Sequence, residues 1–94
     1  MKKVTLYQAK NDEVFIRNMR ARRTNDYAPL SNMEPVVMLR MGKEDSAILD
    51  DVFYMMNCEE YRYSLNYSMS VGDIVDIDGK LYRCLPIGWE TVQK

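Results

Sequence analysis

The chain has 94 residues, of which 47% are apolar and 29% charged, so its length and composition suit one small globular domain over residues 1–94. No stretch approaches the roughly 20 apolar residues of a membrane span, and the N-terminal segment does not resemble a secretion signal. The sequence has no histidine and only two cysteines, which argues against the most common catalytic base, a disulfide scaffold and a thiolate metal cage. We therefore expect a cytoplasmic protein without a metal or cofactor.

The net charge of −1 conceals an uneven distribution. Residues 1–43 hold nine Lys and Arg against four Asp and Glu, a net +5, whereas residues 44–94 hold four against ten, a net −6. Such asymmetry is typical either of two halves that attract each other in one fold or of a bipolar surface that orients on a charged partner.

The first half of the chain carries strand, helix and loop signals. Residues 4–9 (VTLYQA) are rich in β-branched and aromatic residues and predict a first strand. Residues 13–23 (EVFIRNMRARR) fit either a short helix or a second strand. Residues 24–35 are rich in Asn, Asp, Ser and Pro and predict a loop, and residues 36–41 (VVMLRM) predict a strand.

The clearest element is a helix over about residues 46–57. Its apolar residues recur at helical spacing and predict one stripe that faces the core: Ile48, Leu49, Val52, Phe53 and Met56. We expect Asp45 or Ser46 to cap the N-terminus, because a short side-chain oxygen accepts from the free N–H groups of the first turn.

The strongest β-hairpin signal lies at Asp78 and Gly79. A two-residue turn there would pair Asp76 with Leu81. A three-residue loop that ends in a left-handed Gly79 would instead pair Asp76 with Lys80. Because opposite charges then face each other across the strands, at roughly a few tenths of a kcal/mol per pair, we predict the second register.

The remaining segments complete the predicted fold. Residues 58–70 show neither period and predict an irregular connection, whereas residues 89–92 predict a last short strand with the Trp89 indole on the core. The predicted fold class is α+β: a small curled antiparallel sheet, one principal helix across it, and a C-terminal β-hairpin.

Enzymatic activity finds little support in the sequence. Without histidine, the usual Ser–His and Cys–His nucleophile arrangements cannot form. Cys84 lies within a predicted strand, where we expect a buried side chain. Cys58 lies beside two glutamates, and their negative charge disfavours the thiolate form, so Cys58 is a poorer nucleophile. Three carboxylate pairs are each explained by a helix start, a solvated loop or a turn: Asp50/Asp51, Glu59/Glu60 and Asp76/Asp78. We therefore expect a protein that is not an enzyme.

Two groups of residues are candidates for binding a partner. Four arginines lie within seven positions: Arg17, Arg20, Arg22 and Arg23. They form either a solvated basic face or a surface whose guanidinium groups bind phosphate or carboxylate groups. Nucleic-acid-binding domains usually have a clear positive charge, whereas this chain has a pI of about 5.4. Three tyrosines of the irregular connection either cover the edge of the sheet or supply interface area: Tyr61, Tyr63 and Tyr67.

The C-terminal part carries a spaced pattern of SMSVGDIV at 68–75, DGKLYRC at 78–84 and GW at 88–89, preceded by LDDVF at 49–53. Over about residues 36–92 this pattern resembles the YodL-like small domains. Those domains occur in bacteria of the Gram-positive lineage, often on phages and integrative elements. The resemblance implies a genomic setting and supplies no catalytic residues.

Together these observations predict a non-catalytic accessory protein of a phage or mobile element that binds a macromolecular partner. The most specific form of the hypothesis is an inhibitor of a host defence nucleoprotein machine, of the anti-CRISPR or anti-restriction type. The alternative is a small-barrel nucleic-acid-binding module that uses the four arginines.

Overall fold

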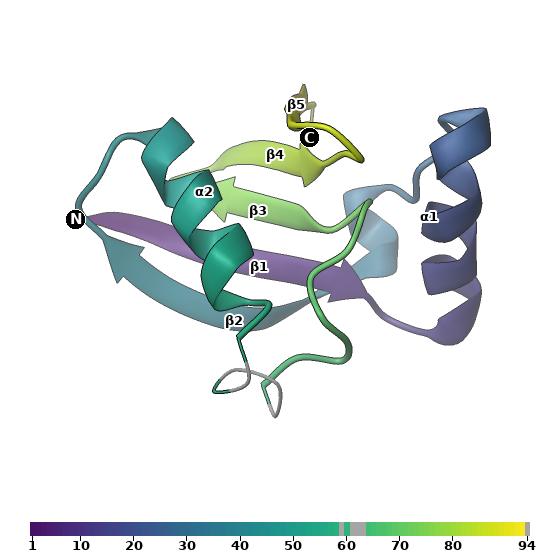
Figure 1. Ribbon diagram of the computed structural model, residues 1–94, viewed down its shortest axis with the longest axis horizontal. Coiled ribbons are helices and arrows are strands. Elements are labelled where there is room, and N and C mark those ends of the chain that lie inside the picture. The colour runs from purple at the N-terminus through teal and green to yellow at the C-terminus, as the bar shows by residue number, and fades with distance from the viewer. Residues whose placement is uncertain (59, 61–63, 94) are drawn as a thin grey trace.

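An antiparallel sheet of five strands carries one helix across a face and a second helix at one end, in a computed structural model that describes residues 1–58, 60 and 64–93 (Figure 1). In chain order the elements are β1 (Lys2–Ala9), α1 (Asp12–Thr24), the 3₁₀ helix η1 (Leu30–Asn32), β2 (Met33–Met41), α2 (Asp45–Met55), β3 (Ile74–Ile77), β4 (Lys80–Cys84) and β5 (Trp89–Val92). The strand order is β2-β1-β3-β4-β5, so the first strand lies inside the sheet between β2 and the central strand β3. The predicted α+β class is confirmed.

The main core lies between α2 and one face of the sheet. Apolar side chains of β1 and β3 pack there against the buried residues of the helix: Val4, Leu6, Val75 and Ile77 with Ile48, Leu49, Val52 and Met56. Burying each such side chain stabilises the fold by about 1.5–3 kcal/mol. A second cluster around Ile74 and Leu81 includes Val14 of α1 and Ala28 of the segment that leads to β2. Both faces of the sheet therefore contribute to the core.

Residues 13–23, which fit a helix or a strand by their pattern, lie in α1. The Asn11 side chain caps the helix by accepting from the Val14 N–H at 3.0 Å. The buried residues are Val14, Asn18 and Ala21, at helical spacing. Because one of them is polar and one is small, the apolar pattern of this segment does not show a helical period.

The helix predicted over residues 46–57 is α2, but its N-terminal cap differs from the prediction. The N-cap residue is Glu44, and its side chain makes no capping hydrogen bond. The Asp45 carboxylate accepts instead from Lys2 Nζ at 2.8 Å and from the Tyr82 hydroxyl. The prediction that Asp45 or Ser46 caps the helix is therefore wrong, because tertiary donors occupy the Asp45 carboxylate.

The buried stripe of α2 is narrower than predicted. Val52 is fully buried, whereas Phe53 is 45% exposed. Consecutive residues of a helix are separated by about 100° around its axis, so Phe53 lies on the flank of the face that Val52 buries. The Phe53 ring contributes instead to hollows beside Leu85 and Pro86.

β3 and β4 form the predicted hairpin, with a two-residue turn. Asp76 pairs with Leu81, and the turn residues Asp78 and Gly79 have φ angles of 51° and 91°, as a type I′ turn requires. The Asp78 carboxylate accepts from the Lys3 N–H at 2.7 Å, and the Asp78 N–H donates to the Lys3 carbonyl at 2.9 Å. The predicted three-residue loop is wrong, because the turn chemistry and the contact with β1 outweigh weak charge pairs across the strands.

The outer strands lie close to their predicted positions. β2 begins at Met33 rather than at residue 36, because Met33 pairs with Ala9 at the end of β1. β5 pairs with β4, and the half-buried Trp89 side chain packs against the main core. Among the described residues, no helix has the length and apolar character needed to cross a membrane.

Candidate binding site

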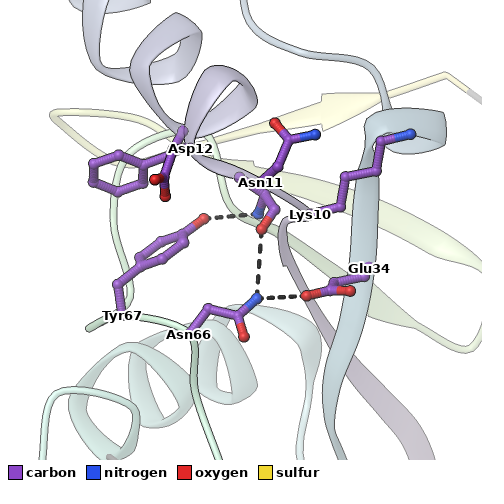
Figure 2. Close-up of a pocket in the computed structure, with 8 residues that line it drawn as sticks. Lys10, Asn11, Asp12, Glu34, Asn66 and Tyr67 are labelled. Atoms are coloured by element: carbon purple, nitrogen blue, oxygen red, sulfur yellow. Dashed lines mark hydrogen bonds between the residues drawn. The ribbon is translucent and has the colours of Figure 1, made fainter.

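Two hollows adjoin at the turn between β1 and α1. We call the first the turn pocket: it has a volume of about 300 Å³ and is lined by residues that include Asp12, Phe15, Glu34, Asn66 and Tyr67 (Figure 2). We call the second the helix groove: it has a volume of about 720 Å³ and is lined by residues that include Glu13, Ile16, Arg17 and Arg20. Lys10 and Asn11 line both hollows.

The polar groups of the turn pocket bond mainly to one another. The Tyr67 hydroxyl accepts from the Ala9 N–H at 2.7 Å, and its ring packs edge-on against Phe15 with the ring centroids 4.5 Å apart. The Asn66 amide donates to Glu34 Oε1 at 2.7 Å and to the Ala9 carbonyl at 3.4 Å (Figure 2). These bonds hold the pocket wall in place and leave few of its polar groups for a ligand.

A buried polar network lies behind the turn pocket. The Asp73 carboxylate accepts from Gln8 Nε2 at 3.0 Å, from the Ser70 N–H at 2.9 Å and from the Tyr67 hydroxyl at 2.8 Å. The Gln8 side-chain oxygen in turn accepts from the Asn66 N–H at 3.0 Å. These bonds attach the segment that precedes β3 to β1.

Burial raises the pKa of Asp73 to about 6, although the donors from Ser70, Gln8 and Tyr67 act in the opposite direction. Burial likewise raises the pKa of Tyr67. A carboxyl group with a raised pKa is often a catalytic acid, but Asp73 has no exposed surface and lines neither hollow. Its position therefore supports a structural role.

The helix groove combines positive charge with an apolar wall. Lys10, Arg17 and Arg20 line it together with one carboxylate, Glu13, and with Ile16, which is 47% exposed. In Figure 2 the Lys10 amine points away from the turn pocket. Such a groove can hold an anionic group and an apolar side chain together.

The helix divides the four predicted arginines among different surfaces. Arg17 and Arg20 share the helix groove, and Arg17 Nη2 also pairs with Asp26 Oδ1 at 3.0 Å. Arg22 lines a separate hollow beside α2, and Arg23 is exposed and lines neither the groove nor the turn pocket. Arg17 and Arg20, three positions apart, lie on one helical face, whereas Arg22 lies about 200° around the helix axis from Arg20 and faces elsewhere.

Of the three tyrosines predicted to bind a partner, the structure describes only Tyr67. Tyr67 lines the turn pocket, but its hydroxyl is engaged within the fold by Ala9 and Asp73. Tyr61 and Tyr63 lie outside the described residues.

Part of the charge asymmetry is neutralised within the fold. Lys2 pairs with Asp45 at 2.8 Å and Lys43 pairs with Asp51, and each pair joins the basic first half to the acidic second half. Ion pairs of this exposure contribute about 0–1 kcal/mol each, so they explain little of the stability.

The cysteine and carboxylate side chains that were candidates for catalysis occupy positions that suit structural roles. Burial raises the pKa of the Cys84 thiol to about 11, which makes it a poor nucleophile at neutral pH. The Asp76 carboxylate accepts from the Gly79 N–H at 2.6 Å, so it stabilises the hairpin turn. In the described part of the chain, no three His, Cys, Asp or Glu side chains gather in a way that could hold a metal ion.

Comparisons of the chain with protein-family models, with curated proteins and with solved structures gave no match. The resemblance to the YodL-like domains over about residues 36–92 therefore stays a prediction. The site itself is the basis for inferring a function.

Proposed function

We propose that the protein is a non-catalytic binding protein whose helix groove holds an acidic segment of a protein partner. The supporting observation is the composition of the groove, in which Lys10, Arg20 and the Asp26-paired Arg17 line the same hollow as the exposed Ile16. Guanidinium and ammonium groups bind carboxylates through charge-assisted hydrogen bonds. An apolar side chain beside them adds area that loses water on binding.

A protein segment suits this groove better than a nucleic acid does. Binding a phosphate backbone draws on a continuous run of cations and usually on a positive domain. Here Glu13 places a carboxylate in the groove, Arg22 lies on another surface, and the pI is about 5.4. Ile16 likewise favours a partner with apolar side chains.

A narrower function extends this proposal: inhibition of a host defence nucleoprotein machine, of the anti-CRISPR or anti-restriction type, in the cytoplasm of the host. It rests on the resemblance to the YodL-like domains and on the setting of phages and integrative elements. In this form, the helix groove would engage an acidic segment on a protein subunit of the machine.

Binding of defined probes tests the proposal. A labelled peptide that alternates Glu and Leu should bind the wild-type protein, and Arg20→Glu should weaken that binding by about tenfold or more, because it reverses a charge in the groove. Arg40→Glu makes the same change at an exposed residue of β2 that does not line the groove, so its affinity should stay within about twofold of wild type. Higher salt should weaken the wild-type complex more than the Arg20→Glu complex.

Two results would count against the proposal. One is equal loss of peptide binding in the Arg20→Glu and Arg40→Glu variants, since the groove would then have no special role. The other is tighter binding to a DNA duplex of the same net charge than to the peptide, which would favour a nucleic-acid-binding module. Affinity capture from a bacterial lysate, with and without nuclease, would then identify the natural partner class.

A further inference from the structure

A second surface of the molecule, which shares no residue with the helix groove, also exposes apolar side chains. Phe53 of α2 is 45% exposed, and Ile87, in the turn between β4 and β5, is 92% exposed. Leu85, Pro86 and Trp89 are exposed or half-buried; they line one hollow with Phe53 and lie within two positions of Ile87 in the chain. We call these five residues the Phe53–Ile87 patch. Exposed apolar patches of this kind commonly mark interaction surfaces.

The backbone presents Ile87 outward. The Leu85 N–H donates to the Gly88 carbonyl at 3.1 Å, which closes the turn between β4 and β5. Gly88 has a φ of +76°, and no heavy atom lies within 4 Å of the place where its Cβ would be. The turn is therefore compact and open to solvent, so a partner can reach Ile87 without any rearrangement of the fold.

Two hollows flank the centre of the patch and carry opposite charges. Both are lined by Phe53, Leu85 and Pro86. One, of about 310 Å³, adds the exposed Asp50, and the other, of about 200 Å³, adds the exposed Arg22. The shared residues thus lie between a carboxylate on one side and a guanidinium on the other.

This arrangement is complementary to itself. A two-fold axis through the centre of a patch exchanges its two ends, so the Asp50 end of one copy meets the Arg22 end of the other. Two ion pairs would then flank an apolar centre in which Phe53 and Ile87 of both copies lose water. A partner of uniform charge would leave one end facing a like charge, which costs affinity.

We propose that two copies of the chain associate through the Phe53–Ile87 patch about a two-fold axis, with Asp50 of each copy paired with Arg22 of the other. This assigns Arg22 to self-association and leaves Arg17 and Arg20 to the helix groove. The dimer would present two helix grooves and could bind two acidic segments together.

Sedimentation velocity over a range of protein concentrations tests the proposal. The wild-type protein should shift from monomer to dimer as its concentration rises. Arg22→Asp and Asp50→Arg should each weaken self-association by about tenfold to a hundredfold, since each change places like charges opposite each other at two symmetry-related sites. The double variant with both changes should recover most of the affinity, because the exchanged charges are again complementary.

Matched controls separate this surface from other effects. Ile87→Asp should abolish the dimer, whereas Met38→Asp, at a residue of β2 that is 66% exposed, should leave it intact. Arg20→Glu, which alters the helix groove, should also leave the dimer intact, so the two proposals can fail separately. Circular dichroism checks that each variant is folded.

Three outcomes would overturn the proposal: a wild-type protein that stays monomeric at every concentration, a dimer that Ile87→Asp does not affect, or a double charge-exchange variant that stays as weak as the single variants. A monomeric protein would also direct attention to a different protein as the occupant of the patch.

Discussion

Replacing Gly72 with alanine tests how closely α1 is held against the segment before β3. A Cβ at this position would lie 2.5 Å from Asn18 Cγ and 2.7 Å from Asn18 Nδ2, so the two groups could not both stay in place. The Asn18 side chain is buried, and its oxygen accepts from the Ala28 N–H at 2.8 Å. Moving Asn18 away from the new methyl group would therefore break a buried hydrogen bond.

The expected loss follows from two contributions. Gly72 has a φ of +96°, and holding an alanine in the positive-φ region costs about 1–2 kcal/mol. Leaving the buried Ala28 N–H without its acceptor costs about another 1–3 kcal/mol. We expect the free energy of unfolding to fall by about 3 kcal/mol, out of the roughly 5–15 kcal/mol of a typical domain. For a domain of this size, Tm should fall by about 12–24 °C.

Urea and thermal unfolding followed by circular dichroism measure this loss. Gly42→Ala is the matched control, because the nearest atom to its added Cβ is Met1 Cγ at 3.8 Å, an ordinary contact. Gly42→Ala should therefore unfold like the wild type. If Gly72→Ala were as stable as Gly42→Ala, the close packing of Asn18 on Gly72 would be refuted.

Three further predictions concern the hairpin and the buried network. Gly79→Val should lower the free energy of unfolding by about 1–2 kcal/mol, because φ is 91° there, and an unchanged Tm would contradict the described turn. Burial raises the pKa of Asp73 from 3.8 to about 6, so the folded protein binds this proton more tightly than the unfolded chain does. The stability from this group should be complete below about pH 4 and lost as pH rises through about 6, by up to about 3 kcal/mol. Urea unfolding at both ends of this range should show that loss in the wild type and not in Asp73→Asn, and parallel profiles for the two proteins would refute it. Tyr67→Phe should cost about 1–3 kcal/mol in the same urea assay, because the Ala9 N–H loses its acceptor, and wild-type stability would show that water replaces the hydroxyl.

Elements with a regular local pattern could be predicted from the sequence, and those that depend on distant contacts could not. The β-branched and aromatic residues at 4–9 predict a strand, the apolar periodicity around Val52 predicts a helix, and the structure confirms both. The hairpin register differs from the prediction because the turn chemistry of Asp78 and Gly79 outweighs the cross-strand charge pairs. The helical state of α1 was ambiguous because its buried stripe includes the polar Asn18.

The candidate site shows the same limit. Four clustered arginines were visible in the sequence, but their division between surfaces depends on the helical phase of α1, which the pattern did not establish. The Gln8–Asp73 hydrogen bond joins residues 65 positions apart. Such long-range pairs can be recognised only once the strand order is known.

The position of β1 between β2 and β3 has a consequence for synthesis on the ribosome. β1 is translated before the other four strands, yet Ile74, the first residue of its neighbour β3, follows Ala9 by 65 positions. At translation rates of about 5–20 residues per second, that distance takes about 3–13 s. During this interval the nascent chain can pair β1 with β2 but holds the other edge of β1 open. The period of greatest exposure to aggregation and to chaperones therefore precedes the emergence of the C-terminal hairpin, which closes that edge.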